Sequence, residues 1–142
     1  MKVKNIMTHN VITITQDMTA LDALRKMNDN TIHHLLVTNQ DNEVTGVLST
    51  RDFPNALDLL EEGSTAMDEF LNKIKSEQFL VKDLMTPNPV GISPEAPLTD
   101  AAKLMLWHNI HSLPVVDNKK LVGIVTDRNL LSALGEMEEA LH

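Results

Sequence analysis

The strongest constraint on the fold is that the sequence repeats itself. The segment "VKNIMTHNVITIT" at 3–15 aligns with "VKDLMTPNPVGIS" at 81–93, so position 3 matches position 81 at an offset of 78. The alignment continues through "DALRKM" against "DAAKLM" and "IHHLLV" against "IHSLPV". One residue is lost in the next turn, so "GVLSTRD" at 46–52 matches "GIVTDRN" at 123–129. An ordered repeat of this length predicts two copies of one supersecondary unit.

Each copy has the pattern of a β-α-β-β-α unit. Short alternating or apolar runs predict strands, and Thr19 followed by Asp22 predicts a capped helix start. The polar turn 40–43 joins two apolar runs into a hairpin. In the first copy we expect strands at 11–15, 34–39 and 44–49, a helix beginning after Thr19, and a second helix beginning at Thr50 or Arg51.

The predicted helices each have one apolar face. In the first copy this face carries Leu21, Leu24 and Met27, and in the second copy it carries Ala101, Leu104 and Met105. Pro97 suits the first helical turn of the second copy. The matched methionines Met7, Met27, Met85 and Met105 fit a role as core filler.

The repeat also sets the domain organisation. We expect an α/β (α+β) fold with repeat 1 at 1–62, a helical linker at 63–80 and repeat 2 at 81–142. About fifty residues is marginal for an independent core. The two copies are therefore expected to pack together with pseudo-two-fold symmetry and a cleft between them.

Composition argues against anionic partners. The 12 basic and 20 acidic residues give a net charge of −8, which repels a phosphate backbone. Three Phe, one Trp and no Tyr offer little base stacking. We therefore expect no nucleic acid partner and no membrane partner. The chain has no cysteine, no secretory signal and no apolar run of about 18 residues, so a cytoplasmic location is expected.

The sequence does not predict an enzyme. No nucleophile, base and orienting group occur in a recognisable spacing, and five glycines form no phosphate-cradling loop. The neighbouring His33 and His34 raise the question of a metal site. Because adjacent residues of a strand face opposite sides, we expect one of these histidines to be buried and the other exposed. We therefore predict no metal site.

The doubled motifs resemble a known family. "MT…N…I", "DA…M", "IH.L.V" and the Gly motif occur once in each copy and in the same order. Together they resemble a tandem pair of cystathionine beta-synthase (CBS) domains, also called a Bateman module, over residues 3–135. The resemblance implies a stand-alone regulatory module that senses an adenosine ligand in the cleft between its two CBS repeats.

The resemblance also implies two ligand sites. In the family, the acid ending the Gly motif holds the ribose diol, and the Ser or Thr lies near ribose or phosphate. Carried onto this sequence, the first site uses Asp52 and Ser49, with Thr50 and Arg51 beside them, and the second uses Asn129 and Thr126, with Asp127 and Arg128 beside them.

Further contacts follow from the same resemblance. The family places a polar or basic group facing the phosphate before the third strand, and an apolar clasp around adenine. These positions correspond to His33 and His34 with Ile12 and Thr13 in the first site, and to His111 and Ser112 with Val90 and Gly91 in the second.

Elementary chemistry favours the first site over the second. A carboxylate can accept two hydrogen bonds from a cis-diol, whereas a carboxamide has one acceptor oxygen and a donor nitrogen. Backbone N–H groups at the start of a helix attract phosphate. Ser49 and Asp52 also form a capping-box pattern, so helix capping is an alternative explanation of these residues, and Arg51 and Arg128 fit solvated helix starts.

Each copy departs from the family pattern at one of the positions near its site. In the first copy, Leu36 stands where the second copy has Pro114 and where the family favours proline. In the second copy, Asp127 adds a negative charge near the expected phosphate. We expect one competent site and one weak or empty site. The expected ligand is AMP, ADP or ATP, or a relative such as S-adenosylmethionine or NAD, with no catalytic cofactor. The alternative is a structural or protein-interaction module with degenerate clefts.

The resemblance finally implies partners. A homodimer is expected through the helices that follow the Gly motifs, together with an unidentified regulated protein on another chain. The candidate dimer contacts are Leu57, Leu60, Leu130, Leu131 and Leu134.

Overall fold

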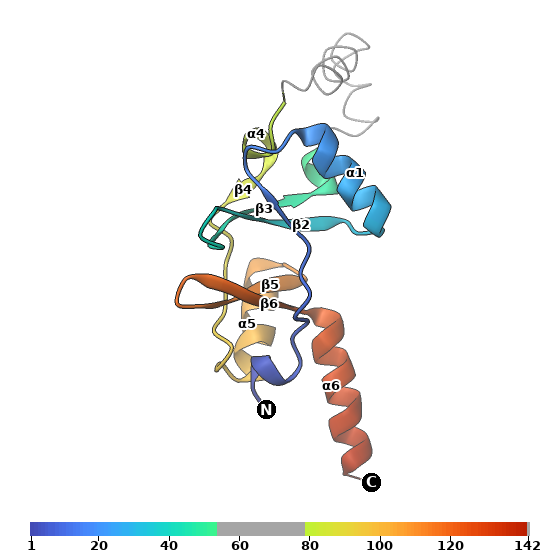
Figure 1. The fold of residues 1–142 in the computed structure, drawn as a ribbon. Coiled ribbons are helices and arrows are strands. Elements are labelled where there is room, and N and C mark those ends of the chain that lie inside the picture. Colours follow the sequence, from blue (N-terminus) through green and yellow to red (C-terminus); the bar gives the residue numbers. More distant parts are fainter. Residues whose placement is uncertain (54–78, 142) are drawn as a thin grey trace. The chain divides into compact units, whose positions relative to one another are not determined.

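The computed structural model describes residues 1–53 and 79–141 (Figure 1). Contacts within it divide the chain into two compact units. The first-repeat unit contains 12–40, 45–53 and 79–88, and the second-repeat unit contains 1–11, 41–44 and 89–141. We describe each unit by itself.

The first-repeat unit has the expected β-α-β-β order. Strand β1 pairs in parallel with β2, and the sheet order is β1-β2-β3-β4, with β4 antiparallel to β3. Its elements are β1 (Thr13–Thr15), α1 (Ala20–Asn30), β2 (His34–Thr38), β3 (Val44–Ser49), the 3₁₀ turn η2 (Thr50–Asp52), α4 (Val81–Leu84) and β4 (Thr86–Pro87).

The second-repeat unit follows the same plan. Its hairpin strands β5 and β6 pair antiparallel, Ile92 forms a parallel bridge to Val115, and Thr8 forms an antiparallel bridge to Ile124. These bridges match the places of β1 and β4 in the other unit. Its elements are η1 (Val3–Asn5), α5 (Leu98–His108), β5 (Ser112–Asp117), β6 (Lys120–Thr126) and α6 (Asp127–Ala140).

In each unit, the segment that pairs with the outer side of the second hairpin strand comes from the other sequence repeat. The Thr8 N–H donates to the Ile124 carbonyl at 2.8 Å, and the Ile124 N–H donates back at 2.9 Å. In the first-repeat unit Thr86 pairs with Val47, the position equivalent to Ile124. The sequence repeat and the contact units therefore have different boundaries.

Helix α1 begins as the sequence predicts. The side chain of Thr19 accepts a hydrogen bond from the Asp22 N–H at 3.2 Å, which confirms the predicted cap. The buried face is Ala20, Ala23 and Met27. The prediction of a buried Leu24 is wrong, since this side chain is 37% exposed.

Helix α5 starts one residue later than predicted. Pro97 is the residue before the helix and not part of its first turn. Its extended backbone (φ −70°, ψ 155°) fits proline in the capping position. Ala101 and Met105 are buried as expected, at the positions equivalent to Ala23 and Met27.

Each unit has its own apolar core, and matched positions fill both cores. Burial of these side chains is the main force holding each unit together. The buried cluster of the first-repeat unit is Ile14, Ala23, Met27, Leu35, Val37, Leu48 and Val81, and that of the second-repeat unit is Val3, Ile92, Ala101, Met105, Leu113, Val115 and Val125.

Several expectations fall outside the described residues. These are most of the helix after η2, most of the linker 63–80, and the dimer contacts Leu57 and Leu60. Of the linker, Phe79 and Leu80 are described, and Leu80 is extended and bridges to Thr19. Among the described residues, no helix is long and apolar enough to cross a bilayer.

Candidate functional site

The residues predicted for the first site lie at one end of one sheet. Strands β1 and β2 are parallel, with Thr13 opposite Leu36, so both begin at the same end of the sheet. Strand β3 ends there, because the Thr50 N–H donates to the His33 carbonyl at 3.0 Å. We call this place the first sheet end. It brings together Ile12, Thr13, His33, His34, Ser49, Thr50, Arg51 and Asp52.

A capping box holds Asp52 in position. Its Oδ2 atom accepts the Ser49 N–H at 2.7 Å, and the Ser49 hydroxyl accepts the Arg51 N–H at 3.2 Å. The capping interpretation is therefore confirmed. The second oxygen, Oδ1, accepts no hydrogen bond from residues in the described ranges. Asp52 thus caps η2 with one oxygen, and within residues 1–53 and 79–141 its other oxygen has no donor.

The residues predicted for the second site gather in the same way. Ser112 pairs with Thr126, and the Asp127 N–H donates to the His111 carbonyl at 3.0 Å, as Thr50 does to His33. The Ile92 N–H bonds the Pro114 carbonyl at 3.0 Å, which brings the start of this segment to the same end. This second sheet end contains Val90, Gly91, His111, Ser112, Thr126, Asp127, Arg128 and Asn129.

Asn129 presents a different group from Asp52. Its Oδ1 atom accepts the Thr126 N–H at 2.9 Å and the Thr126 hydroxyl at 3.0 Å. The acceptor oxygen faces the backbone, so the outward group is the Nδ2 amide donor, which has no partner among the described residues. At this matched position the second sheet end therefore presents an amide donor where the first presents a carboxylate oxygen.

A histidine–aspartate hydrogen bond distinguishes the second sheet end further. His111 Nδ1 lies 3.0 Å from Asp127 Oδ2, and both side chains are more than half exposed. Because an ionised carboxylate only accepts hydrogen bonds, Nδ1 carries the proton in this contact. The equivalent of Asp127 in the first repeat is Thr50, which is uncharged.

His33 and His34 are both exposed. The expectation that one of His33 and His34 would be buried is wrong, because β2 begins at His34 and strand alternation does not apply to His33. Between residues 1–53 and 79–141 there is no group of three or more His, Cys, Asp or Glu that could hold a metal ion.

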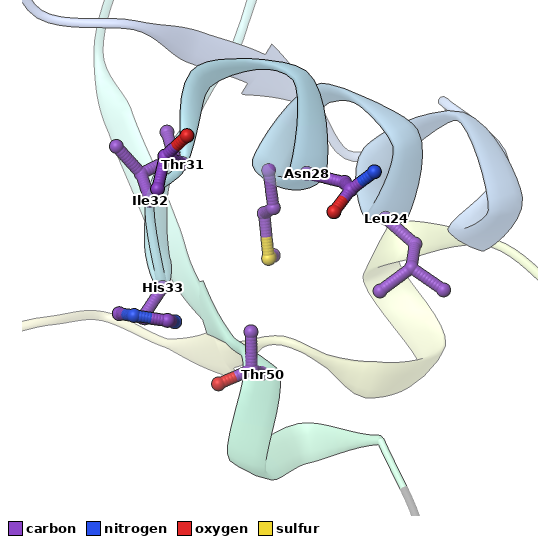
Figure 2. A pocket seen from close by; sticks show the side chains of 7 residues that line it. Leu24, Asn28, Thr31, Ile32, His33 and Thr50 are labelled. Carbon is purple, nitrogen blue, oxygen red and sulfur yellow. The ribbon is translucent and has the colours of Figure 1, made fainter.

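A pocket of about 280 Å³ adjoins the first sheet end. Figure 2 shows Leu24 and Asn28 on α1 and Thr50 at the start of η2, on opposite sides of the opening. His33 and Thr50 belong to the first sheet end, so the pocket extends from it toward the helix. The full lining is Leu24, Met27, Asn28, Thr31, Ile32, His33 and Thr50.

Sequence reasoning missed one cation near the first sheet end. The Lys26 ammonium, on α1, donates to the Thr13 carbonyl at 2.8 Å. The equivalent position in the second repeat is Leu104. Comparing the charge at each matched position of the two copies would have identified Lys26.

The chain belongs to the CBS domain family. The family model described as CBS domain matches residues 3–59 and 81–136, once for each copy of the repeat. Fold and family agree, because the solved structures that resemble this chain include proteins with a pair of CBS domains.

Relatives match this chain almost end to end. A CBS domain-containing protein of Dictyostelium discoideum is 37% identical over 135 residues, covering 93% of this chain and 90% of that protein. The CBS-pair protein CBSX2 from Arabidopsis thaliana is 28% identical with a TM-score of 0.78, covering 97% of this chain and 96% of that chain. A structure of CBSX2 in complex with AMP is 30% identical with a TM-score of 0.75, covering 96% and 98%.

Proposed function

We propose that this protein is a non-catalytic regulatory module that binds an adenosine-containing ligand, AMP, ADP or ATP or a relative such as NAD or S-adenosylmethionine. The observation that carries the proposal is the Oδ1 atom of Asp52 at the first sheet end, which accepts no hydrogen bond from the part of the chain that the structure describes. A carboxylate with one oxygen fixed by its own backbone is oriented before the ligand arrives, so little ordering entropy opposes binding.

The surroundings of Asp52 suit a nucleoside phosphate. Its ionised carboxylate accepts the hydroxyl hydrogens of a ribose diol, and charge-assisted bonds of this kind are the strong ones. Arg51, in the same η2 turn, and His33, whose carbonyl accepts the Thr50 N–H, carry donor side chains at the same sheet end. The solved structure of CBSX2 with AMP, at 30% identity, supports an adenine nucleotide as the first ligand to test.

The test is the binding of AMP, ADP, ATP, NAD and S-adenosylmethionine, measured by calorimetry and by thermal unfolding. A ligand at a hundred times its Kd adds about 2.7 kcal/mol of stability. The decisive variant is Asp52→Asn. The amide oxygen can still accept the Ser49 N–H, so the cap is kept while the outward acceptor is lost.

We expect Asp52→Asn to weaken binding at the first sheet end by about ten- to a hundredfold, the range for losing a hydrogen bond to a charged group. The Tm without ligand should stay near that of the wild type. The control is Asp22→Asn, which removes an exposed carboxylate from α1 in the same unit. Equal affinity of Asp52→Asn and wild type would place the ligand elsewhere.

The alternative is a structural or protein-interaction module. The observation that favours it is Asn129, whose acceptor oxygen is fully used by Thr126. On this alternative no adenosine ligand raises the Tm, and a specific protein is recovered in its place. A regulated protein on another chain is part of our proposal as well, so only the ligand measurement separates the two.

We also propose that the chain forms a homodimer through α6. Leu131 and Leu134 are 68% and 60% exposed on this helix, and Met137 and Leu141 continue the stripe. Leu130, predicted as a further contact, is half-buried against the core of the second-repeat unit. A second copy presenting the same stripe would cover these side chains.

A further inference from the structure

We propose that the two sheet ends select different adenosine ligands. The first takes a phosphorylated adenosine, and the second takes an adenosine compound that carries no phosphate, either neutral or cationic. Asp127 is the residue that sets this difference. The inference rests on the proposed function, since it assigns ligand classes to the same two sites.

Thr50 and Asp127 stand at equivalent backbone positions in the two repeats. The Thr50 N–H and the Asp127 N–H each donate to the carbonyl of the matched histidine, His33 or His111, at 3.0 Å. Each residue is also the first of its helical element, η2 or α6. The two side chains therefore occupy the same place at their sheet ends, one uncharged and the other an acid.

Asp127 Oδ2 lies 3.0 Å from His111 Nδ1, so its charge stands beside the histidine that the family resemblance places facing a phosphate. Like charges a few ångströms apart near a protein surface repel by several times the thermal energy. The acid also lies in the first turn of α6, where it interacts with the partial positive charge of the helix and offsets the attraction for an anion. A phosphate at this place meets repulsion that a nucleoside does not.

His111 uses one of its two ring nitrogens on this acid. Its Nδ1 proton is directed at Asp127 Oδ2 at 3.0 Å, so that proton is not available to a phosphate. In the first repeat no acidic side chain within the described ranges pairs with the equivalent His33. Within those ranges both ring nitrogens of His33 stay available to a phosphate, whereas His111 keeps only Nε2.

A second difference points the same way. Lys26 brings a cation to the Thr13 carbonyl at 2.8 Å, and the second repeat has Leu104 at this position. The first sheet end therefore has a cation that the second lacks. The second sheet end has an acid, Asp127, at a place where the first has none.

The experiment is an amide NMR titration of the full chain with AMP and, separately, with adenosine. The amides of Thr13 and Asp52 report on the first sheet end, and those of Gly91 and Asn129 report on the second. For the wild type we expect AMP to bind the first sheet end more tightly than adenosine does. At the second we expect adenosine to bind at least as tightly as AMP.

The two test variants exchange the residues between repeats. Asp127→Thr should strengthen AMP relative to adenosine at the second sheet end by about tenfold or more, as removal of a neighbouring like charge predicts. Thr50→Asp should weaken AMP relative to adenosine at the first by a similar factor. The control is Asp100→Thr, which removes the same charge from the first turn of α5 and should leave both ratios unchanged.

The outcomes separate the two proposals. If neither compound binds either sheet end of the wild type, the proposed function fails. If both bind but Asp127→Thr shifts the AMP-to-adenosine ratio no more than Asp100→Thr does, the proposed function stands and the ligand assignment is overturned. A wild-type second sheet end that prefers AMP would also overturn the assignment.

Discussion

The Sδ atom of Met7 lies 2.8 Å from the position that a β-carbon on Gly123 would occupy. The Thr8 carbonyl oxygen lies 2.9 Å from the same position, and this oxygen is fixed by its bond with Ile124. Gly123→Ala should therefore push the N-terminal segment off the sheet. We expect a loss of about 1–3 kcal/mol in the free energy of unfolding, measured by chemical denaturation.

Gly135 provides the matched control. No atom lies within 4 Å of its β-carbon position, and it stands in the interior of α6. Gly135→Ala should stabilise the protein by about 0.5–1 kcal/mol, the difference in helix propensity. If both substitutions change stability by the same amount and sign, the close approach of Met7 to Gly123 has no energetic role.

The sequence predicted the elements of each repeat better than their partners. Caps and hydrophobic periods are local, so the strand at 44–49 and the cap at Thr19 could be located from neighbours in the chain. The pairing of Thr8 with Ile124 joins residues far apart in the sequence. An alignment of two copies shows which residues are equivalent, and it carries no information on which copy supplies the segment that pairs with the second hairpin strand.

In the candidate site, too, contacts between near neighbours in the sequence could be predicted and contacts between distant segments could not. The Gly motif predicted the capping contact of Asp52, because it spans three residues, and the matched contact of Asn129 follows the same spacing. It did not predict why Gly46 and Gly123 are glycines. The reason is the close approach of Met85 to Gly46 and of Met7 to Gly123, and these methionines belong to segments far away in the sequence. The exposure of both histidines was missed because strand alternation was applied across the strand boundary, although His33 precedes β2 and His34 is its exposed first residue.

The backbone conformation of Thr31 predicts that replacing it by asparagine stabilises the protein. Thr31 ends α1 with a left-handed backbone, φ 53°, while the equivalent helix end in the second repeat uses Asn109 at φ 51°. A β-branched residue is strained in this region, and asparagine tolerates it better. Thr31→Asn should raise the free energy of unfolding by about 0.5–1 kcal/mol. Thermal unfolding without ligand measures it.

The reciprocal variant is the control for Thr31. Asn109→Thr should lower the stability by a similar amount, because it places the unfavourable residue in the same conformation. A destabilising Thr31→Asn would show that contacts of the threonine side chain outweigh the backbone strain.

The ion pairs of Glu95 with Lys2 and Lys4 predict how the stability of the protein changes with acid pH. Hydrogen bonds from the Lys2 and Lys4 ammonium groups, at 2.7 and 2.9 Å, lower the pKa of the Glu95 carboxyl from 4.5 to about 2. Because the folded pKa is below the unfolded one, the stabilisation is complete above about pH 4.5 and is lost as the pH falls toward 2. The contribution is small because the group is exposed.

The measurement compares the Tm of Glu95→Gln with that of the wild type across pH. The wild type should be slightly more stable at pH 7, and the difference should shrink between pH 4.5 and about 2. Added salt should shrink it at neutral pH as well, since exposed charges are screened. A difference that is constant from pH 7 to 2 would contradict the role of the two lysines.

Charge placed on the exposed stripe of α6 should abolish the proposed homodimer. Leu134 is 60% exposed, and Leu134→Glu would force a carboxylate into an apolar interface without a partner. Ser132→Glu adds the same charge to an exposed position on the same helix, so it controls for net charge. Light scattering should give a dimer for the wild type and for Ser132→Glu, and a monomer for Leu134→Glu. A wild type that is already monomeric, or equal behaviour of both variants, would remove α6 as the dimer contact.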